Sequence, residues 1–301
     1  AELSGLTEQQ VRDVHRASGL PSPGEAPFFS PSEIVMFRLF GLAAEVFSRD
    51  ELLHLVRVMG TSMRRVAEAA SEMFLRDVEA PLKDNDAPST VEMAKANLFG
   101  IELAHSATGV FEPMFMLHLR EATEDIRRAR EGLADYRTLP LTIGFVDLSG
   151  FTTRSGEIPP EELLELVMRF EQTSLDVITD HGGRMVKLIG DEVMFSTVAP
   201  DEACAIAAEL ITEAEQWHVG ARGGLAYGHL VASGGDLYGS VVNLSARLAD
   251  IAVVGEVLVD AAVAERATLH AFQPAGRREL KGFADPVRLW TLTREPSIPV
   301  G

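Results

Sequence analysis

The chain has 301 residues, of which 46% are hydrophobic and 24% charged, and this composition and length suit a globular protein of two domains. Its net charge of −18 divides into −7 for residues 1–137 and −11 for residues 138–301, so neither half offers the basic face that nucleic-acid binding requires. One cysteine, Cys204, cannot form an internal disulfide; the start lacks a signal-peptide pattern and no apolar run is long enough to span a bilayer, so we expect a cytoplasmic protein without a transmembrane segment.

Helical patterns occupy the first part of the chain. A short helix is predicted within residues 1–20, with Thr7 as its N-cap. Apolar residues at three- and four-residue intervals predict helix from Ser32 to about Ala80. "APLKDNDAPST" is interpreted as a loop, and two further helices are expected to break near "FEPMF", since proline interrupts helices.

A charged helical segment at residues 117–137 is the expected connection to the rest of the chain. Its Glu124–Arg128 spacing is an acid-to-base pair one helical turn apart, which supports an exposed helix. The expected organisation is a helical domain over residues 1–116, a helical linker over 117–137 and a second domain over 138–301.

After Pro140 strands alternate with amphipathic helices. Strands are predicted in "LTIGFVDL", "RMVKLIG", "EVMFSTV", "ARGGLAYGHLVAS", "EVLVD", "RRELKG" and "PVRLWTLT", and helices over residues 159–181, 201–218 and 240–252. One strand pair is joined by a tight hairpin, whereas the others are separated by helices. This order predicts an α+β domain of the ferredoxin-like (split βαβ) type, preceded by an all-α domain.

The hairpin "MVKLIGDEVMF" places polar residues inside an apolar run. Gly190-Asp191 is the predicted turn, and Lys187 and Glu192 flank it. Solubility is the plainest explanation, because the tip of a hairpin is wet. In a split βαβ arrangement, however, Asp147 at the end of the first strand meets Asp191 at one sheet edge. Two carboxylates there suit Mg²⁺, although an acid at a strand end is most often only a turn former.

Two other segments carry polar groups in patterns that suit a nucleotide. "SGFTT", which includes Phe151 and Thr152, follows the first strand, and its backbone N–H groups are candidates for cradling phosphate. In "GGDLYGSVVNLSARL", Asn243 and Arg247 are four residues apart and share a helix face, with Asp236 on a Gly-rich loop before them. Taken singly, these residues are better explained as loop and solvated helix surface.

Together these motifs resemble those of the class III nucleotidyl cyclases over about residues 138–293. "FVDLSGFT" and "VKLIGDE" look like the two metal-binding motifs of the family, "DLYGSVVNLSAR" is similar to the segment that binds ribose and base, and "LKGF" to the triphosphate-binding segment. The resemblance implies these roles: metal ligands Asp147, Asp191 and the Leu148 carbonyl; base-selecting Lys187 and Asp236; ribose-orienting Asn243; transition-state Arg247; triphosphate-binding Lys281.

The resemblance also implies the reaction, which is conversion of ATP to 3′,5′-cyclic AMP and pyrophosphate with two Mg²⁺ or Mn²⁺ ions per site. A lysine donor and an aspartate acceptor complement the edge of adenine, whereas guanine reverses that pattern. Lys187 and Asp236 therefore favour ATP over GTP. Only "GG" separates "GHLVAS" from Asp236, as in the bacterial subclass with a short arm.

A homodimer follows from the same resemblance, because sites of this family form between two catalytic domains. One chain supplies the aspartates and the other supplies the base-, ribose- and phosphate-binding side chains, which gives two equivalent sites. Two alternatives stay open: a guanylate cyclase, and an inactive nucleotide-binding dimeric sensor.

The first half resembles the helical regulatory domain of some actinobacterial cyclases, for example in "GLTEQQVRDVHRASGLP". That resemblance implies regulation by pH or a fatty acid. His15, His54, His105 and His118 make a pH switch physically feasible, but most histidines are ordinary surface or core residues. Seven methionines, among them Met59, Met63, Met114 and Met116, suit an adaptable lipid pocket, but methionine more often fills a helical core.

Overall fold

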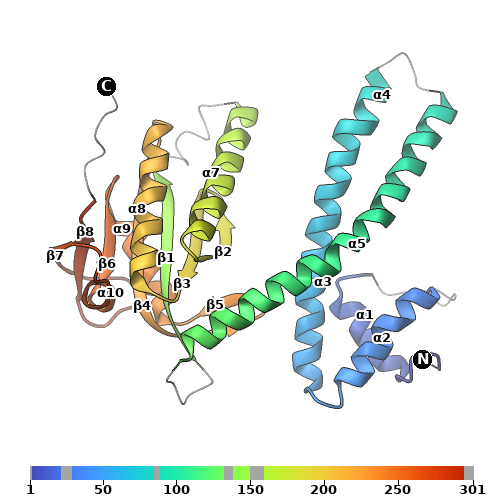
Figure 1. The fold of residues 1–301 in the computed structure, drawn as a ribbon, viewed down its shortest axis with the longest axis horizontal. Coiled ribbons are helices and arrows are strands. Elements are labelled where there is room, and N and C mark those ends of the chain that lie inside the picture. Colours follow the sequence, from blue (N-terminus) through green and yellow to red (C-terminus); the bar gives the residue numbers. More distant parts are fainter. Residues whose placement is uncertain (1, 22–28, 85–88, 132–137, 150–158, 295–301) are drawn as a thin grey trace. The chain divides into compact units, whose positions relative to one another are not determined.

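The computed structural model describes residues 2–21, 29–84, 89–131, 138–149 and 159–294 (Figure 1). Its contacts divide the chain into two compact units, residues 1–118 and 119–301, which are described separately below. The domain boundaries expected from the sequence stay predictions. No helix in the described ranges is both long enough and apolar enough to cross a membrane.

The N-terminal unit is helical, and its first helices begin at strong capping signals. α1 (Glu8–Ala17) has Thr7 as its N-cap in a capping box with Gln10, which confirms that prediction. The predicted helix from Ser32 to about Ala80 is divided into α2 (Pro31–Ala43) and α3 (Arg49–Phe74). Serine caps at residues 30 and 48, each with glutamate three residues later, start the two helices.

Two predictions about later helices are wrong. α3 continues through a π-helical turn (Leu75–Glu79) into α4 (Ala80–Asp84), so the first part of the predicted loop is helical. α5 (Thr90–Ala129) runs unbroken past Pro113, where a break was expected. Proline removes one backbone hydrogen bond, but the other residues of this 40-residue helix keep the helical path.

A small core holds the start of this unit together. It contains the buried side chains of Leu6, Val14, Phe37, Phe40 and Leu52. His15 is also buried, and its ring packs edge-on against Phe29 with 5.3 Å between centroids, whereas the other three histidines are exposed. The four methionines at positions 59, 63, 114 and 116 are exposed as well, so they do not fill a core.

The C-terminal unit alternates strands and helices as expected, with two short additions and one error of position. Its elements are β1 (Leu139–Ser149), α7 (Pro160–Asp180), β2 (Arg184–Ile189), β3 (Glu192–Thr197), α8 (Pro200–Gln216), β4 (Gly220–Ser233), β5 (Asp236–Tyr238), α9 (Ser240–Ile251), β6 (Val257–Asp260), α10 (Ala261–Arg266), β7 (Phe272–Arg278) and β8 (Val287–Leu292). The sequence analysis did not anticipate β5 and α10. β7 ends at Arg278, so the predicted strand "RRELKG" is wrong for its last four residues, which lead into a turn.

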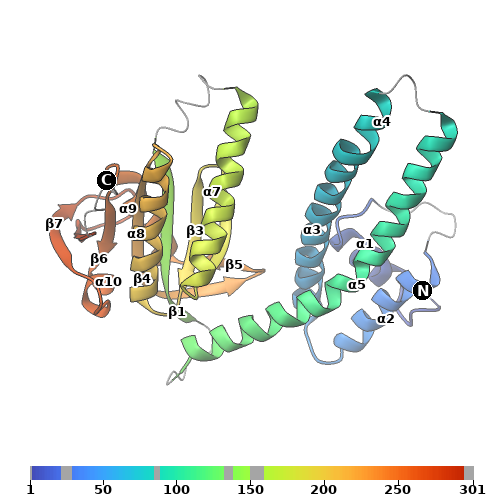
Figure 2. The same ribbon diagram turned by 45° about the horizontal axis from the view of Figure 1, so that its top comes forward.

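The sheet confirms the predicted fold class. Its strand order is β2-β3-β1-β4-β6-β8-β7, with β5 paired to β4. β1 is antiparallel to both β3 and β4, so β1 and β2 run in the same direction with β3 between them. This split βαβ arrangement is the ferredoxin-like pattern. Figure 2 shows α7 and α8 beside each other along one face of the sheet.

Two apolar layers fix the helices on this sheet. On one face α7 and α8 contribute buried residues such as Phe170, Ile178 and Leu210 to a core with β1, β3 and β4. The other layer contains Val241 and Ala249 of α9 together with inward residues of β1, β3 and β4. Because α9 carries two of the predicted site residues, its packing decides where they lie.

Candidate active site

Two of the predicted metal ligands lie at the same end of the sheet, where β1 ends and the β2–β3 hairpin turns. In the β1–β3 ladder Asp147 is opposite Glu192, and the next bond joins the Leu148 N–H to the Asp191 carbonyl at 3.1 Å. The β2–β3 hairpin turns at Gly190, whose positive φ of 66° suits glycine, and this confirms the predicted Gly190-Asp191 turn. The ladder register therefore places Asp147 and Asp191 next to each other.

An arginine that the sequence analysis missed binds the first of these carboxylates. Arg222 on β4 is the ladder partner of Asp147, and its Nε and Nη2 donate to Asp147 Oδ2 at 3.0 and 2.9 Å. Its Nη1 donates to the carbonyl oxygens of Asp250 and Ala252, at the end of α9. Both contacts with Asp147 use Oδ2, so Oδ1 faces none of the described donors.

Negative charge exceeds positive charge at this edge. Burial raises the pKa of Asp147, and the charge of Asp191 adds to this rise, while the hydrogen bond and charge of Arg222 oppose it. Burial also raises the pKa of Glu192 to about 7, helped by the charges of Asp147, Asp250 and Asp191. Glu192, which was expected only to flank the turn as a solvated or structural acid, is half-buried.

The residues present fit a divalent cation. The donors that meet here are hard carboxylate oxygens, which Mg²⁺ and Mn²⁺ prefer. Among the described residues that act on the Asp147 carboxylate, Arg222 is the cation, whereas Asp191 and Asp250 are both acids. The described residues contain no group of three or more His, Cys, Asp or Glu in metal-binding geometry. An ion here would therefore depend on two aspartates and other oxygen ligands, such as water or phosphate.

The two predicted base-selecting residues form an ion pair. Lys187 Nζ lies 2.6 Å from Asp236 Oδ2, and the Leu237 N–H donates to Asp236 Oδ1 at 2.8 Å. Gly234 and Gly235, both with positive φ, form the two-residue turn between β4 and β5. Asp236 follows this turn directly, as the first residue of β5. The lysine and aspartate side chains are 41% and 31% exposed, so a flat base can reach them.

Helix α9 presents the two predicted residues that would bind ribose and phosphate. Asn243 and Arg247 lie one turn apart, and Asn243 is exposed. The opposite face is fixed to the sheet: Ser245 Oγ lies 2.8 Å from the carbonyl oxygens of both Ile143 and Gly224. Arg247 Nη1 donates to Asp250 Oδ2 at 2.6 Å, and because this pair uses one nitrogen of a half-exposed guanidinium, the other N–H groups can still reach a phosphate.

Lys281 stands at a tight turn between β7 and β8. The Phe283 N–H donates to the Leu280 carbonyl at 3.0 Å, and Gly282 takes a φ of 94°, which glycine favours. Leu280 is buried and anchors the turn, while Lys281 is exposed. Among the described residues, Lys281 forms no hydrogen bond or ion pair with the other predicted site residues. Phe151 and Thr152 lie outside the described residues.

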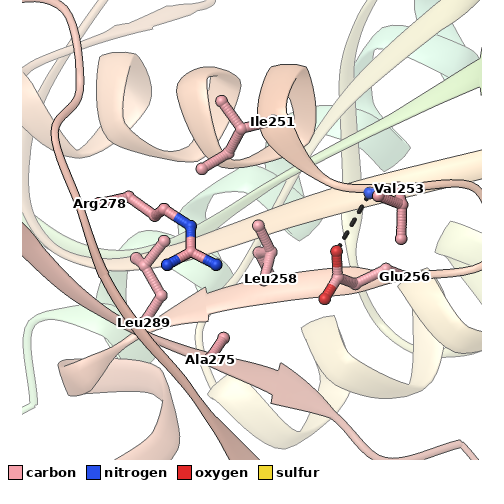
Figure 3. A pocket seen from close by; sticks show the side chains of 7 residues that line it. All are labelled: Ile251, Val253, Glu256, Leu258, Ala275, Arg278 and Leu289. Carbon is pink, nitrogen blue, oxygen red and sulfur yellow. Dashed lines mark hydrogen bonds between the residues drawn. The ribbon is translucent and has the colours of Figure 1, made fainter.

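A pocket of about 250 Å³ occurs elsewhere in this unit (Figure 3). It lies between the end of α9 and strands β6 to β8, and it is lined by Ile251, Val253, Glu256, Leu258, Ala275, Arg278 and Leu289. Its acid is already engaged, since Glu256 accepts bonds from the Val253 N–H and the Thr291 hydroxyl. None of the predicted site residues lines this pocket.

Comparison with known proteins relates nearly the whole chain to cyclases. No protein-family profile matches it. An adenylate cyclase of Streptomyces coelicolor is 31% identical over 88% of this chain and 69% of its own length. An uncharacterised protein of Mycobacterium tuberculosis is 30% identical over 98% of this chain and 78% of its own length. A pH-sensitive adenylate cyclase of the same species is 28% identical over 98% of this chain and 77% of its own length.

Among solved structures, the adenylyl cyclase CyaB from P. aeruginosa covers 54% of this chain and 97% of its own, with 22% identity and a TM-score of 0.48. This structural similarity is too low to support any conclusion beyond those from the sequence comparisons. The relationship to adenylate cyclases, by contrast, covers both units at about 30% identity. The chain belongs to the class III adenylate cyclase family.

Proposed function

We propose that this chain converts ATP to 3′,5′-cyclic AMP and pyrophosphate. The ion pair of Lys187 with Asp236 is the observation that carries the choice of base. It sets one cationic donor beside one anionic acceptor, which complements the N1 acceptor and the amino donor of adenine. Guanine presents a donor at N1 and an acceptor at C6, so it would face like groups and lose both bonds.

The remaining roles follow from the chemistry of each side chain. Asp147, Asp191 and the Leu148 carbonyl would hold two Mg²⁺ or Mn²⁺ ions, which supply activation of the ribose 3′-hydroxyl and neutralise phosphate charge. Arg247 offsets the charge that develops on the α-phosphate, and Lys281 holds the leaving pyrophosphate. Asn243, exposed on the same face of α9, orients the ribose.

A second copy of the chain completes the site. Small-molecule sites bury most of their ligand. Lys187, Asp236 and Arg247 nevertheless expose 41%, 31% and 44% of their side chains in one chain, which is too open to exclude water from a reacting nucleotide. In a two-fold dimer the aspartates of one chain face the base- and phosphate-binding residues of the other, which gives two equivalent sites.

Regulation by the N-terminal unit is part of the proposal. The relative from M. tuberculosis that is named pH-sensitive aligns with 98% of this chain, so the alignment includes the helical unit. Among the four histidines of this unit His15 is the buried one and packs edge-on against Phe29, so its surroundings depend most on how the helices pack. A fatty-acid ligand stays a prediction, with no observation in its favour.

The rival functions predict different products. A guanylate cyclase would cyclise GTP in preference to ATP, and an inactive sensor would bind nucleotide without turnover. The test is incubation of the full chain with ATP or GTP and Mg²⁺ or Mn²⁺, followed by chromatography of cyclic nucleotides. Asp147→Ala and Asp191→Ala are the controls. Cyclic AMP from the wild type but from neither variant is the expected result; preference for GTP, or activity in both variants, refutes the proposal.

A further inference from the structure

Arg184 is a cation near the base-selecting pair that the proposed mechanism does not use. It begins β2, and its Nη2 donates to the carbonyl oxygen of Gly235. Gly235 is the second glycine of the turn between β4 and β5, and Asp236 follows it directly. The guanidinium therefore holds the backbone of the turn that presents the base-selecting carboxylate.

A bulge in β2 explains why both cations of this strand reach the same turn. In a regular strand Arg184 and Lys187, three residues apart, would point to opposite faces. The β2–β3 register shifts between Met185 and Lys187, so Val186 is an extra residue. This shift restores Lys187 to the face of Arg184: the arginine binds the Gly235 carbonyl and the lysine binds the Asp236 carboxylate.

The charge of Arg184 also acts on that carboxylate. Burial tends to raise the pKa of Asp236, but the hydrogen bonds from Lys187 and the Leu237 N–H and the charges of Lys187 and Arg184 outweigh it, so that the pKa is lowered. Asp236 is thus an ionised acceptor at neutral pH. Arg184 acts on it in two ways, through the charge and through the carbonyl that precedes it.

The end of helix α5 also carries a charge that acts on this arginine. Asp125, in the last turns of α5, is the other carboxylate whose charge acts on Arg184. Four residues later, Ala129 is buried in the same apolar cluster as Leu237, the residue after Asp236. The end of α5 therefore packs in the same cluster as the residue that follows Asp236, and Arg184 interacts with carboxylates of both segments.

We propose that Arg184 is a positioning residue for adenine selection, which holds the Gly234-Gly235 turn so that Asp236 accepts from the adenine amino group. The inference rests on the proposed function. Two successive glycines leave this turn with more conformational freedom than any other pair of residues would. Without a bond to the carbonyl, the carboxylate samples positions that suit adenine no better than guanine.

The test compares Arg184→Gln and Arg184→Lys with wild type in the full chain. The measured quantity is the ratio of kcat/KM for ATP to that for GTP. Glutamine is expected to lower this ratio about tenfold, and lysine, which keeps the charge and the ability to donate to the carbonyl, by less. The matched control is Arg294→Gln, which breaks a 2.6 Å pair with Glu215 in the same unit and should leave the ratio unchanged.

A second variant moves the same turn without touching the arginine. At Gly235, with a φ of 81°, an added Cβ meets nothing within 4 Å, so Gly235→Ala strains the backbone without a clash. It should lower the ATP to GTP ratio as Arg184→Gln does. If either variant lowers both kcat/KM values equally, or leaves both unchanged, the proposal is wrong, because a merely structural role does not distinguish the two bases.

A double-mutant cycle separates action through Asp236 from direct contact with the nucleotide. In an Asp236→Asn background, Arg184→Gln should have little further effect on the ratio; independent, multiplying effects would overturn the positioning role. If the wild type cyclises neither nucleotide, the proposed function fails. The Arg184 inference is then decided by the relative affinities for 3′-deoxy-ATP and 3′-deoxy-GTP, which require no chemistry.

Discussion

Gly224→Ala tests whether the close packing of α9 on the sheet is needed for activity. Gly224 lies on β4 against α9, where an added Cβ would come 2.3 Å from the backbone nitrogen of Ala249 and 2.3 Å from the carbonyl oxygen of Ser245. It would also lie 2.7 Å from Leu248 Cβ. Two of these three atoms belong to the helix backbone and cannot rotate aside. The helix must therefore move away from β4, and Arg247 moves with it.

The size of the effect follows from these distances. Ordinary contact begins at 3.4 Å, so α9 must retreat by about 1 Å. Overpacking of a core typically costs about 1–3 kcal/mol, and we expect about 3 kcal/mol here because backbone atoms are involved. That is a fall in melting temperature of roughly 6–12 °C for a unit of this size. A misplacement of about 1 Å at a reacting group costs about 100-fold in rate.

The neighbouring Gly223 is the matched control on the opposite face of β4. An added Cβ there would lie 3.3 Å from the Phe145 oxygen and 3.4 Å from Val146 Cγ2, which small shifts can relieve. Thermal unfolding followed by circular dichroism and the rate of cyclic AMP formation are the two measurements. If Gly223→Ala and Gly224→Ala have the same melting temperature and the same rate, the packing argument is refuted.

Three other changes test base choice, electrostatics and regulation. Lys187→Glu combined with Asp236→Cys should reduce kcat/KM for ATP by orders of magnitude, and unchanged ATP kinetics would exclude the base-reading role. Burial raises the pKa of Asp260 to about 6 in the folded chain, so the folded state holds a proton that the unfolded state releases near pH 4. The free energy of unfolding of the wild type should therefore fall by up to about 3 kcal/mol as the pH rises from about 4 to 6. Asp260→Asn, which keeps an N-cap acceptor, should remove this loss in denaturant titrations; an equal pH dependence in both proteins would contradict it. Removal of residues 1–137 should alter the pH–rate profile between roughly pH 5.5 and 8, and an unchanged profile would show that the N-terminal unit is not the sensor.

Local signals explain which parts of the fold were predictable from sequence. The Thr7 capping box and the Gly190-Asp191 turn depend on residues within four positions of one another, and both are confirmed. Alternation of strands and helices was enough to predict the split βαβ order. Strand β5 was missed because it has three residues, too few for a period-two pattern, although the two glycines before it are an ordinary hairpin signal.

The parts that the sequence could not provide depend on contacts between distant segments. Arg222 binds Asp147 across 75 positions, and only the β1–β4 register brings them together. The unbroken helix at Pro113 is a second case, since the surrounding helix outweighs a local breaker. The bulge at Val186 is a third: periodicity alone would have placed Arg184 and Lys187 on opposite faces.

Mixing two inactive chains tests whether the site is shared. Asp147→Ala and Arg247→Ala homodimers should each be nearly inactive, because every site lacks one essential group. In a mixed dimer one site receives both defects, while the other pairs an intact Asp147 from one chain with an intact Arg247 from its partner.

If equal amounts of the two variants exchange at random, half of the dimers are mixed and each has one whole site of two. The mixture should therefore recover about one quarter of wild-type activity, and the recovery should fall as either variant is put in excess. A site contained within one chain predicts no recovery at any ratio. With exchange verified by fluorescence transfer between labelled chains, absence of recovery would refute the shared site and leave the relationship to adenylate cyclases unaffected.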